Sequence, residues 1–347
     1  MARFDCKNEG YRMPAEWQQQ SCTWLGWPVF EGREELWGAH YETVCQEFAL
    51  LARTIAKYQV CNVTAQHQYA DLARSLCGPL VKVHAVDAED NWVRDFGPIF
   101  LTGAEGLAAA VFQFNAWGEK YSNYQGCKKL AANIANKANA RIIYSDMVLE
   151  GGAFYVDGSG SLLTTESCLL NANRNPHMNK GSIELELKRM LGVENIIWLP
   201  GNLLETETNG HIDGIAAFIA EGKILFQNAN PDQGDYFRIM QENRRALELA
   251  TDTNGRRFEI LDLPAPIVTE HLSEERNCDC YANYVLVNGA VLSTAFGAQQ
   301  DAEAKAVFSK AFPERVIEML PVTHIGMGGG SMHCSTQQQP ALLQPEK

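Results

Sequence analysis

The chain of 347 residues is 46% hydrophobic and 20% charged, which is typical of a folded protein with a large core and excludes a disordered chain. Its formal net charge of −13 argues against nucleic acid or an anionic membrane surface as a partner, and is compatible with a small cationic substrate. Ten scattered cysteines do not form the framework of a small secreted domain, and the N-terminal residues lack an apolar segment, so we expect a cytoplasmic protein without signal peptide or membrane span.

Hydrophobic periodicity predicts helices and strands in alternation along the chain. The clearest helical patterns cover residues 35–58, 182–190, 235–250 and 301–312. Short runs with strand character lie at residues 60–64, 81–85, 108–114, 141–144, 153–156, 161–165, 195–199, 215–219, 223–226, 284–288 and 290–294. The Asp-Gly and Asn-Gly pairs that begin at residues 157 and 288 each separate two such runs, and they predict two β-hairpins.

This interleaving of helices and strands predicts a mixed α/β fold. No low-complexity tract, charge block or Pro/Ser-rich linker divides the sequence, and no repeat of fixed period is visible in it. We therefore expect a single domain over residues 1–347, with 228–231 as the one alternative boundary.

Four glycine-containing breaks beside predicted strands carry the candidate functional residues. They are DNWVRDFGP (90–98), LEGGAF (149–154), TETNGHIDG (206–214) and GGGSMHC (328–334). Glycine allows the backbone to approach a ligand or to adopt a positive φ, and catalytic side chains are often carried by such loops on a rigid frame. The side chains in these breaks are therefore candidates for one shared site.

The spacing of residues within the breaks predicts which side chains face one another. In an extended backbone, side chains two positions apart share a face, so His211 and Asp213 can reach a common ligand. Consecutive side chains point to opposite faces, which favours a structural role for His333 rather than that of a base for Cys334. The same alternation turns Asp95 away from the arginine that precedes it.

A cysteine, a histidine and several carboxylates in one pocket suit attack on a cationic carbon. A guanidinium keeps its charge up to a pKa of about 12.5 or more, and carboxylates accept its forked N–H donors. Its central carbon is a poor electrophile, which favours a sulfur nucleophile and an acid that protonates the departing nitrogen. The residues therefore favour covalent chemistry on a guanidine.

Further stretches strengthen this interpretation: MPAEW, WLGWP, FNAWG, LLTTESCLLNANRNP and GGSMHCSTQQQP. Together with the four breaks, they resemble the agmatine deiminases, a family of guanidine-modifying enzymes, over residues 13–340. The resemblance implies an α/β fold in the form of a five-bladed propeller with pseudo-fivefold symmetry. It also implies hydrolysis of agmatine to N-carbamoylputrescine and ammonia through a covalent S-amidino cysteine intermediate, with no cofactor and no metal.

The resemblance implies a catalytic role for three residues. Cys334 resembles the nucleophile, His211 the general acid/base, and Glu150 the carboxylate that completes the triad. The sequence departs from the family pattern at Gly214, where asparagine is common, and at residues 331–332, where Ser-Met replaces Asn-Ile. Residues 228–284 also match less well, so the departures concern the recognition of the substrate's tail.

The resemblance also implies substrate-binding residues and an assembly. Asp95 and Asp213 resemble the pair of carboxylates that binds the guanidinium. Trp92 and Glu207 resemble residues that line the substrate channel, with Glu207 placed to meet the distal amine. The family further suggests a homo-oligomer, most simply a two-fold dimer.

Other functions remain open from the sequence. The substrate can instead be arginine or peptidyl-arginine, or an amine can replace water in amidino transfer by the same intermediate. A cysteine protease or acyl transferase leaves the carboxylate-rich breaks without a role. Cys278 and Cys280 suggest metal or redox binding, but they form C-x-C instead of the usual C-x-x-C, and no second cysteine pair lies near them in the sequence. A catalytically inactive binding protein would be expected to lack one of the core residues, and all five are present.

Overall fold

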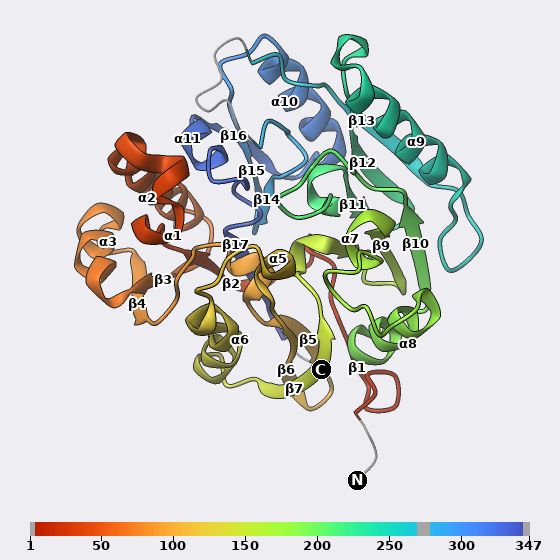
Figure 1. The fold of residues 1–347 in the computed structure, drawn as a ribbon, viewed down its shortest axis with the longest axis horizontal. Coiled ribbons are helices and arrows are strands. Elements are labelled where there is room, and N and C mark those ends of the chain that lie inside the picture. Colours follow the sequence, from red (N-terminus) through yellow and green to blue (C-terminus); the bar gives the residue numbers. More distant parts are fainter. Residues whose placement is uncertain (1–3, 269–277, 343–347) are drawn as a thin grey trace.

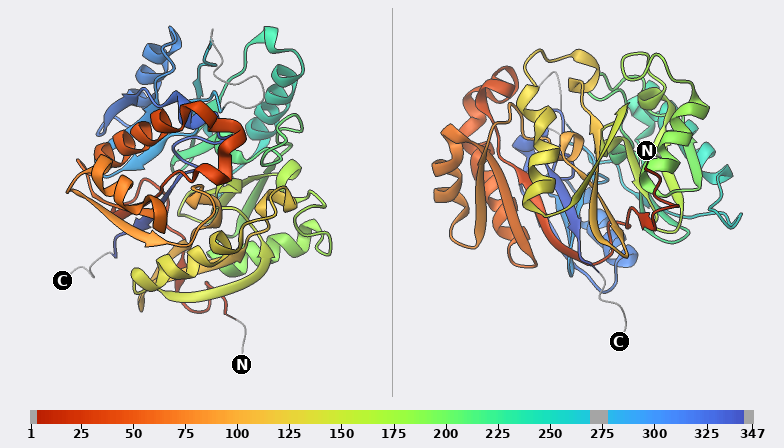
Figure 2. Two further views of the ribbon diagram at one scale, coloured as in Figure 1. Left: turned by 60° about the vertical axis from the view of Figure 1, so that its left-hand side comes forward. Right: turned by 90° about the horizontal axis from the view of Figure 1, so that it is seen from below.

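The computed structural model describes residues 4–268 and 278–342. Its strands form five sheets, of which two have four strands and three have three. The sheets follow one another around the centre of the molecule, with the longer helices towards its periphery (Figure 1). Two other views show the same arrangement of helices outside the sheets (Figure 2).

The three-stranded sheets share one design. Each contains an antiparallel hairpin and a third strand that runs parallel to the second strand of the hairpin. Their strands are β8 (Phe154–Val156), β9 (Ser161–Thr165) and β10 (Asn195–Leu199); β11 (Ala216–Ala220), β12 (Lys223–Gln227) and β13 (Glu259–Leu263); β14 (Val285–Val287), β15 (Ala290–Thr294) and β16 (Val316–Leu320). The helices before the third strands are α7 (Glu166–Leu169) with α8 (Lys180–Leu191), α9 (Asp235–Leu249) and α10 (Gln300–Ala311).

The two four-stranded sheets contain the same unit with one added strand. In one sheet, β5 and β6 form the hairpin, β7 is parallel to β6, and β1 is added at the edge. In the other, β17 is antiparallel to β2, and β3 and β4 continue the sheet in parallel. Their elements are β1 (Tyr11–Arg12), β2 (Gln20–Gly26), α2 (Tyr41–Ile55), β3 (Val60–Gln66), α3 (Ala70–Cys77), β4 (Val81–Val86), β5 (Ile99–Gly103), β6 (Gly106–Gln113), α6 (Gln125–Lys137), β7 (Arg141–Val148) and β17 (Thr336–Pro340).

The pairing of β17 with β2 joins the two ends of the described chain. Thr336 lies opposite Leu25, and the pairing continues to Pro340 opposite Gln20. One sheet is therefore completed only when the last strand returns to the first long strand.

Short helices occupy many of the connections. They are α1 (Phe30–Trp37), α4 (Val93–Phe96), α5 (Ala116–Glu119), α11 (Thr323–Gly326), and the 3₁₀ helices η1 (Gly38–His40), η2 (His67–Tyr69), η3 (Gly151–Ala153), η4 (Ile212–Gly214) and η5 (Pro231–Gln233). Within the described residues, no helix is long and apolar enough to cross a membrane.

The sequence predicted much of this architecture. All eleven predicted strand runs correspond to strands, and both predicted hairpins form, as β8–β9 and β14–β15. The mixed α/β class is confirmed. The single helix predicted over residues 35–58 is wrong, because Gly38 adopts a φ of 39° and ends α1 before α2 begins at Tyr41. Helices α3 and α6 were not predicted.

Candidate active site

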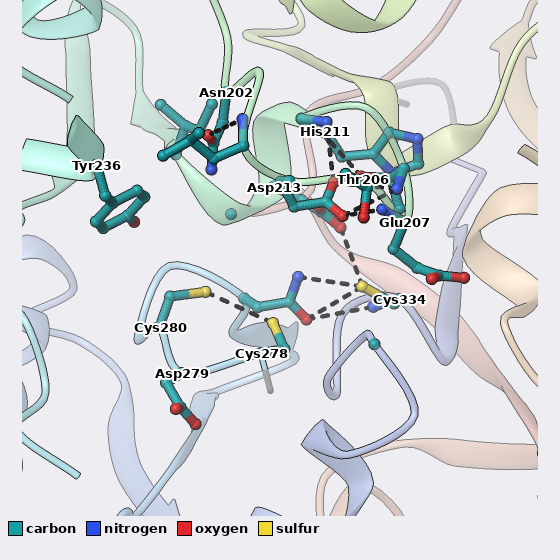
Figure 3. Close-up of a pocket in the computed structure, with 18 of the residues that line it drawn as sticks. Asn202, Thr206, Glu207, His211, Asp213, Tyr236, Cys278, Asp279, Cys280 and Cys334 are labelled. Atoms are coloured by element: carbon teal, nitrogen blue, oxygen red, sulfur yellow. Dashed lines mark hydrogen bonds between the residues drawn. The ribbon is translucent and has the colours of Figure 1, made fainter. Parts of the chain in front are cut away.

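A cavity of about 400 Å³ opens between segments from several of the sheets. Its wall includes Glu207, His211, Asp213, Asn283 and Cys334 (Figure 3). These residues lie far apart in the sequence, so the fold is what assembles the site.

Each of the four glycine-containing breaks follows a strand that runs parallel to its neighbour. Residues 90–98 follow β4, 149–154 follow β7, 206–214 follow β10, and 328–334 follow β16. Loops at the carboxyl ends of parallel strands commonly form binding sites, because they meet at one edge of the sheets. Residues of two breaks, 206–214 and 328–334, line the cavity, and Asp95 and Glu150 from the other two breaks each lie 3.8 Å from the imidazole of His211.

The extended backbone assumed for the breaks is wrong. Asp95 lies in the short helix α4, His211 immediately precedes η4, and Cys334 lies in a turn before β17. His211 and Asp213 still line one cavity. Arg94 and Asp95 also diverge as expected, since consecutive side chains of a helix point about 100° apart.

Two of the three glycines before Cys334 fit against aromatic rings. A Cβ atom on Gly328 would lie 2.8 Å from ring atoms of both Trp37 and Trp92. One on Gly330 would lie 2.9 Å from the Trp92 ring and 3.0 Å from Cβ of Cys334. Side chains are thus excluded from this loop, and its backbone packs directly on Trp92, which places the cysteine against the cavity.

Cys334 is 7% exposed, and its sulfur lies among polar groups. Sγ is 3.4 Å from Oδ2 of Asp213 and 3.2 Å from Nδ2 of Asn283. Burial, and then the negative charges of Asp213 and Asp95, raise the pKa of this thiol well above its ordinary value. The sulfur therefore carries its proton unless a positive charge comes close to it.

Asp213 belongs to a buried chain of charged groups. Its Oδ2 accepts a hydrogen bond from Nδ1 of His333 at 3.0 Å, and Nε2 of His333 donates to Oε1 of Glu16 at 3.0 Å. Glu16 in turn pairs with Nη1 of Arg94 at 3.0 Å. Burial and the charge of Arg94 lower the pKa of His333, but the larger combined effect of Glu16 and Asp213 raises it above the ordinary value. The imidazolium form is therefore favoured. The pKa of Asp213 is lowered despite its burial, chiefly by His333.

The structural role expected for His333 is therefore supported by these contacts. The side chain is fully buried and bridges two carboxylates. It points at Asp213 and Glu16, and the carboxylate of Asp213 lies between it and the sulfur of Cys334.

His211 lies between two other carboxylates. Its Nδ1 is 3.8 Å from Oδ1 of Asp95, and its Nε2 is 3.8 Å from Oε2 of Glu150. Burial lowers the pKa of His211, but Asp95 and the neighbouring groups outweigh it, and the pKa lies well above the ordinary value. The imidazole is therefore held as a proton donor that faces the cavity.

Asp95 and Glu150 differ in their partners. Asp95 accepts hydrogen bonds from Nε1 of Trp117 at 2.8 Å and from the backbone N–H of Gly152 at 3.0 Å. Burial and the charges of the other carboxylates nevertheless raise its pKa to about 6. Glu150 is just as buried, but it pairs with Nε of Arg174 at 2.7 Å. Arg174 and His211 overcome the effect of burial and lower the pKa of Glu150 to about 2.

Arg174 is a site residue that sequence reasoning missed. Besides Glu150, it donates from Nη1 to Oδ1 of Asn209 at 2.6 Å and from Nη2 to the carbonyl of Thr208 at 2.9 Å. One guanidinium thus joins the loop after β7 to the loop that carries His211. The motif NANRNP contained the signal, since an arginine between asparagines in a strongly matching stretch suggests a buried polar network.

Glu205 was also missed. Its carboxylate accepts hydrogen bonds from the backbone N–H groups of Glu207, Thr208 and Gly210. These contacts fold residues 205–210 into a compact turn and direct the side chain of Glu207 to the cavity wall.

Trp92 and Glu207, the two expected channel residues, differ in their position. Glu207 lines the cavity and accepts a hydrogen bond from the hydroxyl of Tyr121. Trp92 is 3% exposed and packs beneath the glycine loop, beside Cys334. A channel-lining role for Trp92 stays a prediction.

Glu150, Cys168 and His211 offer three possible metal-ligand atoms within 4.8 Å of one another. The site is poorly suited to a metal cation, because Arg174 already pairs with Glu150 and the raised pKa of His211 favours the protonated ring.

Cys278 and Cys280 lie in the cavity wall with their sulfur atoms 3.8 Å apart.

Comparisons with known proteins identify the family. The model of the Porphyromonas-type peptidyl-arginine deiminase family matches residues 12–340, and the chain belongs to this family. An agmatine deiminase from Pseudomonas aeruginosa strain LESB58 is 36% identical over 358 residues, which cover 96% of each chain. The resemblance to agmatine deiminases is therefore confirmed.

Two solved structures are similar over nearly the whole chain. The agmatine deiminase of Enterococcus faecalis has a TM-score of 0.94 and 29% sequence identity, and the match covers 99% of both chains. A Cys-to-Ser variant of the C. jejuni agmatine deiminase, solved with substrate bound, has a TM-score of 0.86 and 28% identity, with 96% of this chain and 97% of that chain covered.

Gly152 offers a test of how closely the site is packed. A Cβ atom there would lie 2.7 Å from Nδ1 of His211, 2.9 Å from Oδ1 of Asp95 and 3.0 Å from Oδ2 of Asp213. We expect Gly152→Ala to lower the free energy of unfolding by about 1 to 3 kcal/mol, as overpacking does elsewhere. Urea denaturation measures this change.

Gly214→Ala is the matched control. Gly214 lies in the cavity wall, and a Cβ atom there meets nothing within 4 Å. We expect a change within about 0.5 kcal/mol. Equal urea midpoints for Gly152→Ala and the unmodified protein would contradict the packing described.

Proposed function

We propose that the protein hydrolyses the guanidinium group of agmatine to N-carbamoylputrescine and ammonia. The observation that carries this proposal is a single cavity whose wall holds a thiol, an imidazole and several carboxylates, in a chain 36% identical to agmatine deiminases over 96% of its length. The activity is that of a hydrolase acting on a C–N bond of a linear amidine.

The carboxylates Asp95 and Asp213 bind the guanidinium. Both are buried within a few ångströms of the imidazole of His211, and Asp213 also contacts the sulfur of Cys334. The forked N–H groups of a guanidinium are matched by carboxylate oxygens, and low local polarity strengthens the pairing. The bound cation therefore brings the central carbon of the substrate to the nucleophile.

Substrate binding also prepares the nucleophile. The thiol of Cys334 is held protonated by burial and by the charges of Asp213 and Asp95, which raise its pKa. A guanidinium placed among these groups cancels their charge and stabilises the thiolate. The sulfur is therefore activated when a cation of the correct type is present.

The first half-reaction forms the covalent intermediate. Sulfur of Cys334 attacks the guanidinium carbon, the bond from carbon to one terminal nitrogen breaks, and ammonia leaves. His211 donates the proton that the departing nitrogen needs, and the thiol releases its own proton to solvent as the C–S bond forms. The carboxylates of Asp95 and Glu150, each 3.8 Å from the imidazole, keep it protonated until that step.

The second half-reaction releases the product. Water adds to the carbon of the S-amidino intermediate, the neutral imidazole of His211 takes a proton from it, and the C–S bond breaks. The carbon keeps two of its three nitrogens, the one that bears the tail and one terminal nitrogen, and gains the oxygen of water, which gives a ureido product. The second proton of the added water returns to the sulfur of Cys334, and the proton that the thiol released in the first half-reaction converts ammonia to ammonium.

The cavity wall favours a substrate with a second positive charge. The described residues that line it include the acidic residues Glu205, Glu207, Asp213 and Asp279. No lysine or arginine is among the described residues of this wall. Arginine carries an α-carboxylate beside its amine, which agmatine lacks. Two like charges 4 Å apart repel by roughly 4 kcal/mol at an effective dielectric of about 20, so Glu207 disfavours arginine.

Arg94 does not offset this preference. Its guanidinium is 3% exposed and pairs with Glu16, away from the cavity. The alternatives are deimination of arginine or peptidyl-arginine, as the description of the family model suggests, and amidino transfer to an amine. Assays of ammonia release from agmatine, arginine and peptidyl-arginine, and of amidino transfer to an amine, distinguish these reactions.

We also propose that residues 1–347 form one catalytic domain, a five-bladed α/β propeller with pseudo-fivefold symmetry. Five sheets with a repeated hairpin-and-parallel-strand unit, one of them completed by the pairing of β17 with β2, support this proposal. Assembly as a homodimer, a cytoplasmic location and independence from cofactors are proposed from the family resemblance alone.

The pKa of Asp95 leads to a pH prediction. Because the raised pKa is about 6, the carboxyl loses its charge as the pH falls through that value, and the guanidinium loses a partner. We expect kcat/KM for agmatine to rise with pH through about 6. Asp95→Asn should remove this acidic limb and lower kcat/KM at least about tenfold, which corresponds to the loss of a charged hydrogen bond. A wild-type profile that is flat across this range would refute the role of Asp95.

A second prediction concerns the tail of the substrate. We expect ammonia release from agmatine to exceed that from arginine and peptidyl-arginine. We also expect Glu207→Gln to reduce the rate with agmatine at least about tenfold and to reduce the ratio of the agmatine rate to the arginine rate. The matched control is Glu42→Gln, which changes an exposed carboxylate on α2, outside the cavity. Preference for arginine, or an agmatine rate unchanged by Glu207→Gln, would overturn the assignment of substrate.

A further inference from the structure

Asn283 is a buried amide in the cavity wall that the chemistry above does not use. It lies in the loop after β13, just before β14, and is 3% exposed. The preceding backbone N–H groups of Tyr281 and Ala282 donate to Oε1 of Gln227, at 2.8 and 3.2 Å. Gln227 is itself buried and donates to the carbonyl of Pro264 at 2.8 Å. The side chain of Gln227 therefore holds the loop that carries Asn283 in place.

The amide of Asn283 contacts the nucleophile at three points. Its Oδ1 accepts a hydrogen bond from the backbone N–H of His333 at 3.0 Å and from that of Cys334 at 3.4 Å. Its Nδ2 lies 3.2 Å from the sulfur of Cys334, and Oδ1 lies 3.5 Å from the same atom. In Figure 3, dashed lines mark the hydrogen bonds that reach the sulfur of Cys334.

The backbone contacts decide which end of the amide faces the sulfur. The two N–H groups of residues 333 and 334 are donors and need an acceptor, which only the amide oxygen supplies. With the oxygen held there, the NH₂ group is directed to the sulfur at the shorter distance. The contact is therefore a hydrogen bond from nitrogen to sulfur.

We propose that Asn283 is a catalytic residue, whose Nδ2–H stabilises the thiolate of Cys334 when the nucleophile loses its proton. The proposal rests on Cys334 as the nucleophile of the proposed reaction. Asp213 faces the same sulfur at 3.4 Å and opposes a negative charge on it. A hydrogen bond to a charged acceptor contributes more than one between neutral groups, so the amide offsets part of that repulsion.

The neutrality of the amide matters as much as its donor. A lysine or arginine at this position would stabilise a thiolate more strongly, but it would also repel a guanidinium that has to reach the same sulfur. An amide stabilises the anion without adding a charge to the cavity. It therefore suits a nucleophile whose substrate is a cation.

The test uses the pH dependence of Cys334 alkylation by iodoacetamide in the full-length protein, followed by mass spectrometry of the peptide that contains Cys334. Asn283→Asp keeps an oxygen for the two backbone N–H groups and replaces the N–H donor with an oxygen that shares a negative charge. The neutral variant Asn283→Ser is therefore measured beside it, to separate the lost donor from the added charge. We expect alkylation at pH about 8 to be at least about tenfold slower, with the profile displaced by one pKa unit or more, since one unit is a tenfold change in thiolate.

The matched control is Asn288→Asp. Asn288 lies at the other end of β14, where Nδ2 donates to the carbonyl of Gln20 at 2.8 Å, outside the cavity wall. This variant also loses one amide donor and should keep the wild-type alkylation profile. Thermal melting shows whether each variant is folded. Asn283→Ser is measured in every case, because its shorter side chain removes the amide donor without adding a charge.

An unchanged alkylation profile in folded Asn283→Asp or in folded Asn283→Ser would overturn the proposal, and so would a displacement in Asn283→Asp alone, which the added carboxylate explains. The result is independent of the substrate. If agmatine is turned over and the profile is unchanged, this inference fails and the proposed function stands. If agmatine is not turned over and the profile is displaced, the inference stands and the proposed function fails.

Discussion

The site concentrates carboxylates that burial penalises, and each of them has to be matched by a cation or a hydrogen-bond donor. Glu150 is matched by Arg174, and Glu16 by Arg94, in pairs that are almost completely buried. Removing one member of such a pair leaves an uncompensated charge in the interior, which commonly costs 3–5 kcal/mol. These pairs therefore constrain the loops around the cavity before any substrate binds.

Asp95 is the carboxylate with the weakest compensation. Its partners are the indole N–H of Trp117, the backbone N–H of Gly152 and the more distant imidazole of His211. Its pKa is raised to about 6, whereas the pKa of Glu150, with an arginine in direct contact, is lowered to about 2. The two carboxylates that face the imidazole of His211 thus have different roles. Glu150 stabilises the surrounding loops through Arg174, and Asp95 gains a partner when a cation enters the cavity.

The fold makes this concentration of charge possible. Every site residue that the sequence suggested lies in a loop that follows a strand paired in parallel with its neighbour, and the loop after β13 adds Asn283. Polar groups from five such loops meet where the backbone is least regular. The sheets and outer helices bury the apolar residues elsewhere, which leaves the centre free for a polar cavity.

Local signals in the sequence predicted eleven of the seventeen strands in the described residues and several residues of the cavity. Runs rich in Val, Ile and Leu, such as NIIWL and KILF, are apolar enough to be recognised without a partner, and Asp-Gly and Asn-Gly identify their hairpins. His211, Asp213, Glu207 and Cys334 line one cavity, as their motifs suggested. The local geometry was wrong, because the glycine-rich breaks fold into short helices and turns instead of extended segments.

The long-range partners were not predictable from local pattern. Glu16 and His333 are 317 positions apart, and nothing near either residue indicates the other. Arg174 is only 24 positions from Glu150, but its role depends on a loop closing over it. Asn283 has no titratable group and lies in an ordinary turn sequence, so only its distance to the sulfur reveals it. Helix α3, with eight residues, was too short for its periodicity to be distinctive.

The most direct test of the covalent chemistry is to trap the intermediate. The protein is mixed with agmatine, quenched in acid within the first turnovers, and digested for mass spectrometry of the peptide that contains Cys334. We expect that peptide to gain the mass of agmatine less ammonia, and the gain to be absent from Cys334→Ser, which should also release no ammonia. Turnover of agmatine by Cys334→Ser, or an adduct on a different cysteine alone, would contradict the assignment of Cys334 as the nucleophile.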